Sequence, residues 1–590
     1  MKKYINLLGN NKKHIIIFVI LNMFLVIVET FSIALIPLFI DFAINDNSLL
    51  PKYIFFFENY LNNLDKQKAI LGVSIILILL FIFKNIYVFG LISYQAILSK
   101  KFSHQLKKTF FSLYINAPFE IITSYNSSQL LRNVEDETSE YINNFFLILK
   151  SIKDFLLFTA IFILLLLVNL ISTLIAVLSL LFFLLCYYLI FYKILNKLGG
   201  NSLSSKNELN KMVLQSFSSI KTIKVGKKQN LILNKFLQMV NIFEDARKKI
   251  NIIQSIPNSL FEIVFVIIIF SMVSYVSQLE LKNFLPILSL YAISFIRLLP
   301  IFSRFGQIIS TLRSTYPSVN HLNSEIKFLK TFEQIEKKKI NSNLDNNKVV
   351  VFKKKIEIKN LSFKYLKGSD DVIKNLNLSI NKGNSIGLVG KSGSGKTTLI
   401  NLICGLLSYS RGSITSDDID ILDNIDSWQK KIGMVPQDNY LLDDSIKNNI
   451  LFFDENKNID QKKFSDAIYY SGVTDFINTQ KNGLDTKVGE KGSFLSGGQV
   501  QRIALARALY LDPEILILDE FTNSLDPDSE DFILRKLEIL KKEKNKNFFI
   551  ISHKIKPLKI CDEIFVLENG KISEKYNYNQ FYEKFGQLYG

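Results

Sequence analysis

Cysteine is scarce in this sequence of 590 residues, and its placement excludes several kinds of site. The three cysteines, Cys186, Cys404 and Cys561, are scattered and lack the spacing of a metal site. We interpret all three as reduced core residues. The sequence therefore offers no redox or cysteine-ligated metal chemistry.

The sequence also lacks any cluster of basic residues interleaved with aromatic residues, although its formal net charge is +18. Its lysines are spread along the whole chain, which disfavours nucleic acid as a partner. Cytoplasmic loops of membrane proteins collect Lys and Arg, so a membrane protein explains the charge more simply.

The sequence also predicts no cleavable leader. The first apolar run, Ile15–Ile40, is too long for the core of a signal peptide and has no small-residue cleavage site. We expect this run to remain as a membrane span.

What the sequence does have is long apolar stretches in its first half. A chain of this length needs at least two domains, and residues up to about 320 contain apolar runs longer than a soluble core requires. Six stretches can each form a helix that crosses about 30 Å of hydrocarbon: Ile15–Ile40, Ile70–Leu98, Phe145–Val168, Leu170–Leu195, Ile256–Val276 and Phe284–Leu312.

The distribution of basic residues orients these spans. The segment between the fourth and fifth spans carries twelve basic residues between Lys193 and Lys249, whereas the loops on the opposite side carry few. Both termini are therefore expected in the cytoplasm, at the cytoplasmic (inner) membrane. The cytoplasmic connections are long, which indicates helices that continue well beyond the membrane.

The second half of the chain has a different pattern. Residues 331–346 are polar and rich in Asn and Lys, which indicates a linker between a transmembrane domain at 1–330 and a second domain at 347–590. In the second domain short apolar runs alternate with helical patterns, as expected of an α/β domain with a largely parallel sheet.

A glycine-rich segment in the second domain predicts a P-loop. It follows the strand-like Ser385–Val389 and precedes a helical pattern, and it consists of Gly390, Lys391, Ser392, Gly393, Ser394, Gly395, Lys396 and Thr397, with Thr398 next to it. Backbone amides of such a loop surround phosphate oxygens, Lys396 reaches the β- and γ-phosphates, and the Thr397 hydroxyl can bind Mg²⁺. We expect ATP and Mg²⁺ here.

Two acidic residues follow the apolar run Ile515–Leu518, which has the composition of a strand buried on both faces. Because ligands of parallel sheets bind beyond the carboxyl ends of strands, Asp519 and Glu520 should face the nucleotide. We expect Asp519 to hold Mg²⁺ and Glu520 to orient the attacking water as a general base.

The segment Leu495-Ser496-Gly497-Gly498-Gln499 resembles the signature motif of ABC ATPases, which distinguishes this family from other P-loop proteins. The resemblance implies an α/β P-loop domain with an ABC helical subdomain. It also implies further roles: Tyr365 stacks on adenine, Gln437 is the glutamine of the Q-loop and a magnesium ligand, Asp526 is the aspartate of the D-loop, and His553 contacts the γ-phosphate. Asn523 stands where the family commonly has a small residue.

In this family the signature residues Ser496, Gly497, Gly498 and Gln499 of one domain close over the P-loop of another. A chain with a single such domain must therefore pair, and we expect a homodimer in which both sites hydrolyse ATP. Six spans ahead of the ATPase, and Thr486–Gly492, which resembles the X-loop of exporters, point to outward transport. By position and resemblance, Pro118–Ser128 and Phe217–Val225 would be coupling helices.

The first and sixth predicted spans resemble those of bacterial flippases for lipid-linked oligosaccharides, through Val28–Ala34 and through Arg297-Leu298-Leu299-Pro300 with Arg304. The resemblance implies an amphipathic lipid-linked substrate. Arg297 and Arg304 are two helical turns apart and share a face, so they could bind an anionic headgroup such as a pyrophosphate. Alternatively, they pair with Glu29 or Glu262, or lie at the inner membrane interface.

Other interpretations stay open at this point. An amphipathic helix over Pro51–Leu64 would contact a lipid tail or form a structural lid. The chain could instead export another lipid, a drug or a peptide, or act as a non-pumping channel or regulator. A peptide exporter is disfavoured because no protease domain precedes Ile15, and a channel or regulator is disfavoured because Glu520 and His553 are both present.

Overall fold

The computed structural model describes residues 12–44, 65–168, 170–276, 281–343, 349–366, 368, 370–454 and 459–589. It divides into two compact units, of which one comprises Met1–Ala117 and Ser124–Glu333 and the other Pro118–Thr123 and Gln334–Gly590. The helix expected over Pro51–Leu64 lies outside the described residues.

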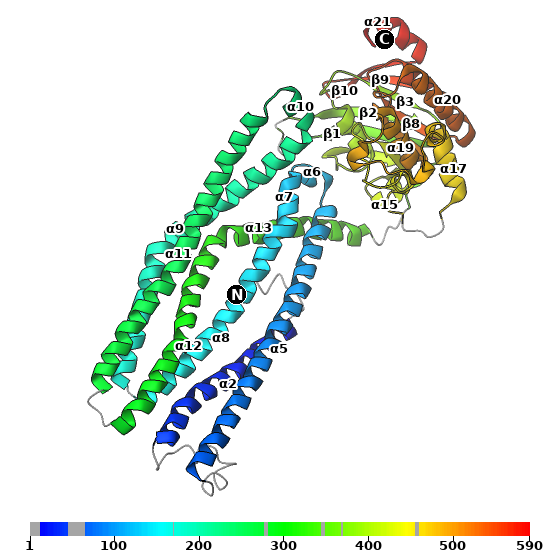
Figure 1. Cartoon of the computed structure of the whole chain (residues 1–590). Coiled ribbons are helices and arrows are strands. Elements are labelled where there is room, and N and C mark those ends of the chain that lie inside the picture. Colours follow the sequence, from blue (N-terminus) through cyan, green and yellow to red (C-terminus); the bar gives the residue numbers. More distant parts are fainter. Residues whose placement is uncertain are drawn as a thin grey trace. The chain divides into compact units, whose positions relative to one another are not determined.

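The first unit is entirely helical where it is described (Figure 1). Its helices are α2 (Lys12–Ile44), α5 (Lys66–Ile115), α7 (Ser127–Arg132), the π-helix η3 (Asn133–Glu137), α8 (Thr138–Val168), α9 (Leu170–Ser218), α10 (Ile220–Val225), α11 (Gln229–Val276), α12 (Leu281–Ser314) and most of α13 (Tyr316–Asn343).

Each of the six predicted spans lies within one of these helices: α2, α5, α8, α9, α11 and α12. Five of the six are long and apolar enough to cross a membrane, over Lys12–Ile44, Lys66–Ile115, Val177–Ser218, Gln229–Ile267 and Leu288–Ser314. The exception is α8, whose apolar stretch also carries Lys150, Lys153 and Asp154. The count of six spans therefore stays a prediction.

Three helices are much longer than a membrane requires, as the long connections indicated. α5, α9 and α11 have 50, 49 and 48 residues. At about 1.5 Å per residue each is more than twice as long as about 30 Å of hydrocarbon. α9 and α11 run side by side (Figure 1). Each segment proposed as a coupling helix contains a short helix, α6 (Phe119–Ile122) in one and α10 in the other.

Aromatic residues fill the core of the helical unit. Phe261 and Phe302 are almost fully buried and their ring centroids lie 5.4 Å apart, which joins α11 to α12. Phe158 of α8 packs edge-on against Phe302 at 5.3 Å. The outer faces are also apolar, since Ile86 and Phe89 of α5 are 66% and 71% exposed. Such a surface suits hydrocarbon and not water.

The predicted linker is helical over most of its length, because α13 continues to Asn343. Lys and Glu predominate over Glu333–Lys339, and both are good helix formers even where no apolar face is buried. The polar composition was therefore compatible with a helix as well as with a loop.

The second unit contains two sheets. One is antiparallel, in the order β2-β1-β4-β5, with β1 (Lys355–Phe363), β2 (Ile373–Asn381), β4 (Arg411–Ser416) and β5 (Ile419–Asp420). The other has the order β10-β9-β3-β8-β7-β6, in which only β10 at the edge is antiparallel. Its strands are β3 (Ile386–Val389), β6 (Ile432–Val435), β7 (Ile515–Asp519), β8 (Asn547–Ile551), β9 (Glu563–Glu568) and β10 (Lys571–Tyr576).

Helices connect these strands. They are α14 (Lys396–Ile403), α15 (Ile425–Gln429), α16 (Ile446–Leu451), α17 (Gln461–Tyr470), α18 (Val473–Ile477), α19 (Gly497–Tyr510), α20 (Pro527–Lys544) and α21 (Tyr578–Tyr589), with the short 3₁₀ turns η5 (Gly483–Asp485), η6 (Glu490–Gly492) and η7 (Lys556–Ile560). α6 belongs to this unit by contact.

The parallel sheet is buried on both faces. In β7, Leu516 and Leu518 join one hydrophobic cluster, and Ile515 and Ile517 join the other. This is the alternation that a strand between two helical layers requires, and it confirms the prediction made from the apolar run. Cys404 and Cys561 are buried free thiols in these two cores, whereas Cys186 of α9 is only partly buried.

Candidate nucleotide-binding site

The predicted P-loop connects β3 to α14 and makes one wall of a cavity of about 320 Å³. A side chain at Gly390 would put its Cβ 2.3 Å from the Leu567 carbonyl oxygen, so only glycine allows the loop to approach β9 this closely. Gly395 has a φ of +105° at the N-cap of α14, a conformation that also favours glycine. These two positions give the loop its shape.

Lys396 is buried and its ammonium group is held inside the P-loop. Its Nζ donates hydrogen bonds to the carbonyl oxygens of Gly390, at 2.7 Å, and Lys391, at 3.1 Å. Burial lowers the pKa of Lys396, while the nearby Glu520 and Asp519 carboxylates oppose this change. A cation fixed in this way faces the space that the loop encloses.

Three parallel strands bring the remaining side chains together at their carboxyl ends. β6 ends just before Gln437, β7 ends at Asp519 before Glu520, and β8 ends just before His553. All of them line the same cavity as the P-loop, together with Val372, Ser392, Gly393, Gly395, Lys396, Thr397, Thr398 and Ile551. The position expected from the sequence for Asp519, Glu520, Gln437 and His553 is therefore the one observed.

Glu520 is the centre of a hydrogen-bond network. Its Oε2 accepts from Gln437 Nε2 at 2.9 Å and from Asn523 Nδ2 at 2.7 Å. Its Oε1 lies 3.3 Å from His553 Nε2. The Glu520 backbone has a φ of +48°, which is uncommon for a residue with a side chain, and its N–H donates to the Ile551 carbonyl at 2.9 Å. The side chain of Glu520 is thus fixed from three directions.

Asp519 lies behind Glu520 and is buried. Burial raises the pKa of Asp519 to about 6, Glu520 adds to this increase, and Lys396 opposes it. Asp519, the Thr397 hydroxyl and the Gln437 amide oxygen offer hard oxygen donors on one side of the cavity. This donor set fits Mg²⁺, which binds few protein oxygens and completes its shell with phosphate and water oxygens.

Tyr365, which the resemblance assigned to adenine, does not line the cavity. Its hydroxyl lies 3.0 Å from Thr398 Oγ1, and its ring packs edge-on against Phe363 with centroids 4.9 Å apart. It therefore neighbours the P-loop helix.

The signature residues are also outside this cavity. Ser496 begins α19 with a capping box, because its Oγ accepts from the Gln499 N–H and its N–H donates to Gln499 Oε1. A Cβ on Gly497 would lie 3.0 Å from Ser524 Cβ, so Gly497 packs closely on the turn after Glu520. Asp526 caps α20 by accepting from the Ser529 N–H at 2.9 Å. The cavity of a single chain thus lacks the signature motif.

Asn523 is a residue whose role the sequence did not indicate. It differed from the family pattern, but only the structure reveals that its amide contacts Glu520. The available signal was a hydrogen-bond donor three residues after a carboxylate in a turn.

The predicted headgroup arginines have different partners. Arg304 makes a bidentate ion pair with Asp154 of α8, through Nε at 2.7 Å and Nη2 at 2.8 Å. The partner is therefore neither Glu29 nor Glu262, the acids considered from the sequence, because α8 brings Asp154 beside this position of α12. Arg297 is half-buried and makes no ion pair within the described part of the chain.

Around Arg297 the helical unit holds an excess of positive charge. Lys84 of α5 is buried, and it interacts electrostatically with Arg297, Glu29 and Lys153. This group comprises three basic side chains, Lys84, Lys153 and Arg297, and one acidic side chain, Glu29.

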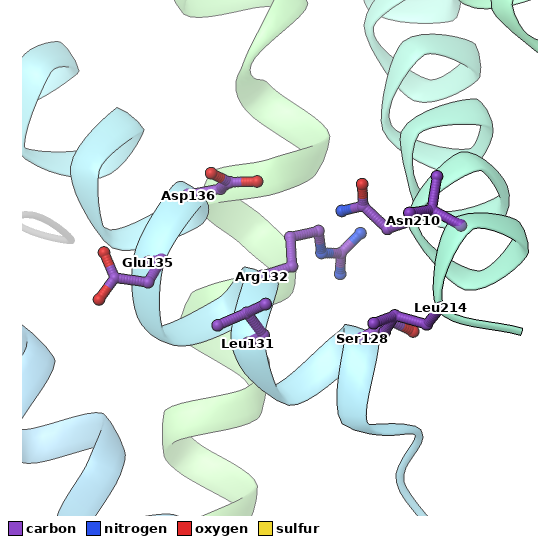
Figure 2. A pocket seen from close by; sticks show the side chains of 8 residues that line it. Ser128, Leu131, Arg132, Glu135, Asp136, Asn210 and Leu214 are labelled. Carbon is purple, nitrogen blue, oxygen red and sulfur yellow. The ribbon is translucent and has the colours of Figure 1, made fainter. Parts of the chain in front are cut away.

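A second cavity, of about 370 Å³, lies between α7, η3 and α9 in the helical unit. Figure 2 shows the Arg132 guanidinium pointing from α7 toward Asn210 of α9. Arg132 Nε lies 3.5 Å from Glu137 Oε1, and both side chains are at most 3% exposed. Arg132 Nε and Nη1 make no hydrogen bond among the described residues. Burial raises the pKa of Glu137 to about 7, although Arg132 opposes this change.

Comparison with known families gives two matches on this chain. The model for the ABC transporter transmembrane region matches residues 15–299, and the model for the ABC transporter ATPase matches residues 373–523. Together they account for most of the sequence.

Comparison with individual proteins gives relatives for part of the chain. ATP-dependent lipid A-core flippases from Wigglesworthia glossinidia brevipalpis, Vibrio parahaemolyticus and Escherichia coli K12 are each 38% identical to it over 232 residues. The match covers 39% of this chain and 39% of each relative.

Among solved structures, a bacterial Atm1-family exporter with ATP bound matches 98% of this chain and 97% of its own, with a TM-score of 0.76 and 18% identity. At this identity the likeness concerns the fold.

Proposed function

The chain belongs to the ABC transporters and has the fused transmembrane and ATPase domains of an exporter half-transporter, and on this premise we propose that it flips or exports an amphipathic lipid-linked substrate. ATP hydrolysis drives the movement across the cytoplasmic membrane, and the substrate is a lipid-linked oligosaccharide. Both termini lie in the cytoplasm.

The observation that carries this proposal is the convergence of Lys396, Thr397, Asp519, Glu520, Gln437 and His553 on one cavity at the carboxyl ends of parallel strands. Lys396 and the P-loop amides bind the ATP phosphates. Glu520 orients the attacking water and accepts its proton, and His553 contacts the γ-phosphate. Thr397, Gln437 and Asp519 hold Mg²⁺, which neutralises the charge on the phosphate oxygens.

The absence of the signature residues from this cavity supports a homodimer. The capping box and the close packing on Ser524 fix the start of α19, which contains Ser496, Gly497 and Gly498. This start of α19, with Gln499 in the capping box, completes the cavity of a second copy, and Asp526 lies at the adjoining turn. Two identical sites result, and both hydrolyse ATP.

Coupling between hydrolysis and transport is assigned to the segments containing α6 and α10. By contact, Pro118–Thr123 belongs to the compact unit of the ATPase domain. The Leu366 N–H donates a hydrogen bond to Glu120 Oε1 of α6, close in sequence to Tyr365. These contacts support a role for α6 as a coupling helix.

The substrate class rests on the charges in the helical unit. Arg297 has no acidic partner among the described residues, and the basic side chains around it exceed the acidic ones by two. A pyrophosphate-linked headgroup offers matching negative charge and accepts charge-assisted hydrogen bonds. The relatives are named lipid A-core flippases, which supports movement of a lipid, and a glycolipid of the lipid A type is the second candidate.

The test is to reconstitute the full chain in liposomes and to measure ATP hydrolysis and lipid flipping together. A polyprenyl-pyrophosphate oligosaccharide and a lipid A-type glycolipid are offered in parallel, and Glu520→Gln is the matched control. This variant should hydrolyse about 10²- to 10⁴-fold more slowly, the usual effect of losing a general base. We expect ATP-dependent flipping of the pyrophosphate lipid by the wild type only.

Three results contradict parts of the proposal. If the wild type and Glu520→Gln hydrolyse ATP at the same rate, Glu520 is not the general base. If ATP is hydrolysed and only the glycolipid is flipped, the second candidate becomes the substrate. If ATP is hydrolysed but neither lipid moves, the proposal of a lipid substrate is rejected. The protein would then export a drug or a peptide, or have a non-pumping role.

A further inference from the structure

The turn after β7 contains a contact that links two of its own residues. Asn523 Nδ2 donates to Glu520 Oε2 at 2.7 Å, and the Asn523 backbone N–H donates to the Glu520 carbonyl at 3.2 Å. The turn therefore closes on itself through both backbone and side chain. Glu520 adopts its φ of +48° within this turn.

The two oxygens of the Glu520 carboxylate have different surroundings. Oε2 accepts two amide hydrogen bonds, one from Gln437 on a neighbouring loop and one from Asn523 on the same turn. Oε1 lies 3.3 Å from the His553 ring nitrogen. A carboxylate held by two donors on one oxygen has little freedom to rotate, so its other oxygen keeps a constant direction.

The contribution of Asn523 differs from that of Gln437. Gln437 lies on a separate loop after β6 and is assigned to Mg²⁺, so its amide has another task once nucleotide binds. Asn523 lies on the same turn as Glu520, three positions later in the chain. Its hydrogen bond is thus independent of the position of the neighbouring loop.

We propose that Asn523 is a positioning residue for ATP hydrolysis: its side-chain amide holds Oε2 of Glu520 so that Oε1 is presented to the attacking water. This inference rests on the proposed function, in which Glu520 is the general base. Asn523 is not among the residues that line the cavity, so it acts through Glu520.

The experiment compares steady-state ATP hydrolysis of the full chain in liposomes for the wild type, Asn523→Ala and Asn523→Asp. Loss of one hydrogen bond to a charged group should lower kcat by about tenfold in Asn523→Ala. The KM for ATP should stay unchanged, because the P-loop is not altered. Asn577→Ala, which removes an exposed Asn at the start of α21, serves as the control and should have no effect.

Asn523→Asp supplies a second measurement, the pH dependence of kcat, which would not change if Asn523 had a purely structural role. This substitution keeps the shape but replaces a donor with a carboxylate beside Glu520, so kcat should fall further than in Asn523→Ala. Part of the loss should be recovered as the pH is lowered from 8 toward 5.5, because protonation removes the repulsion between the two acids. Asp519, Lys396 and His553 also face Glu520 but are common to all variants, so the ratio to wild type isolates residue 523.

A double-mutant cycle tests whether Asn523 acts through Glu520. In a Glu520→Gln background, measured by single-turnover hydrolysis, Asn523→Ala should have no further effect. An unchanged kcat of Asn523→Ala, or equal effects with and without Glu520, would overturn the inference while the proposed function stands. A wild type that does not hydrolyse ATP would overturn both.

Discussion

Arg297 and Arg304 share one face of α12, yet their surroundings give them different roles. Arg304 is bound by Asp154, whose side chain is 2% exposed, whereas Arg297 has no ion pair among the described residues. Removing Arg304 leaves a buried carboxylate without its cation. Removing Arg297 leaves no such group.

This difference makes a prediction for single variants. Arg304→Ala should lower the thermal unfolding midpoint in detergent, since leaving the buried Asp154 carboxylate without its partner costs on the order of 3 kcal/mol. Asp154→Asn combined with Arg304→Ala should restore most of that loss. Arg297→Ala should unfold like the wild type and hydrolyse ATP normally, but flip the pyrophosphate lipid more slowly. Normal flipping by Arg297→Ala would exclude the headgroup role, and a normal midpoint for Arg304→Ala would exclude a stabilising pair.

Residues that directly follow a buried strand were predictable from the sequence. Asp519, Glu520 and His553 each come after an apolar run, and parallel strands bring their carboxyl ends to one edge. The Arg304–Asp154 pair was not predictable, because it depends on how α8 and α12 rotate about their axes. The contact from Asn523 to Glu520 depends on side-chain direction inside a turn, which a sequence pattern does not specify.

Among the elements, the π-helix η3 is the most unusual feature of the helical unit. It connects α7 to α8 and carries Glu137, which is buried beside Arg132. The folded chain holds the Glu137 proton more tightly than the unfolded chain does, because its pKa is raised to about 7 from 4.5. Between these values the folded state binds more protons, so its stability decreases as the pH rises.

The prediction concerns unfolding midpoints between pH 5 and 8. The midpoint of the wild type should fall relative to that of Glu137→Gln as the pH rises through 7, because the glutamine does not ionise. At about 1.4 kcal/mol per pKa unit the change is on the order of 3 kcal/mol. Only the slope is compared, since Glu137→Gln also leaves Arg132 without a counter-charge at every pH.

Glu135→Gln is the matched control for this measurement. Glu135 is two residues away, and its side chain is 55% exposed and paired with Lys107. Its curve should run parallel to that of the wild type. If the Glu137→Gln curve is parallel as well, the buried carboxylate does not titrate in this range.

Helix positions were easier to predict than helix ends. All six apolar stretches lie in helices, because a run of this length has no other way to satisfy its backbone in lipid. The end of α13 was missed because polar residues continue this helix through the predicted linker, and composition does not distinguish a solvated helix from a loop. α7 and η3 had no periodic signal long enough to detect.

At the scale of the whole molecule, the proposed dimer determines which variants can complement each other. The P-loop of one copy would meet the signature motif of the other, so Lys396 and Ser496 of one chain serve different sites. Lys396 and Glu520 of one chain line the same cavity and serve the same site. The two pairs of variants therefore predict opposite results when inactive chains are mixed.

Chains with Ser496→Arg mixed with chains with Lys396→Ala should form dimers that contain one intact site and one doubly damaged site. The isolated mixed dimers should recover roughly half of the wild-type rate, because one of their two sites is intact. Chains with Glu520→Gln mixed with chains with Lys396→Ala should recover nothing, since each site then carries one lesion. The mixed dimers are isolated through two different affinity tags, and their ATP hydrolysis is measured directly. Recovery in the second mixture would mean that Lys396 and Glu520 of one chain serve different sites. No recovery in the first mixture would mean that one intact site does not suffice or that each chain completes its own site.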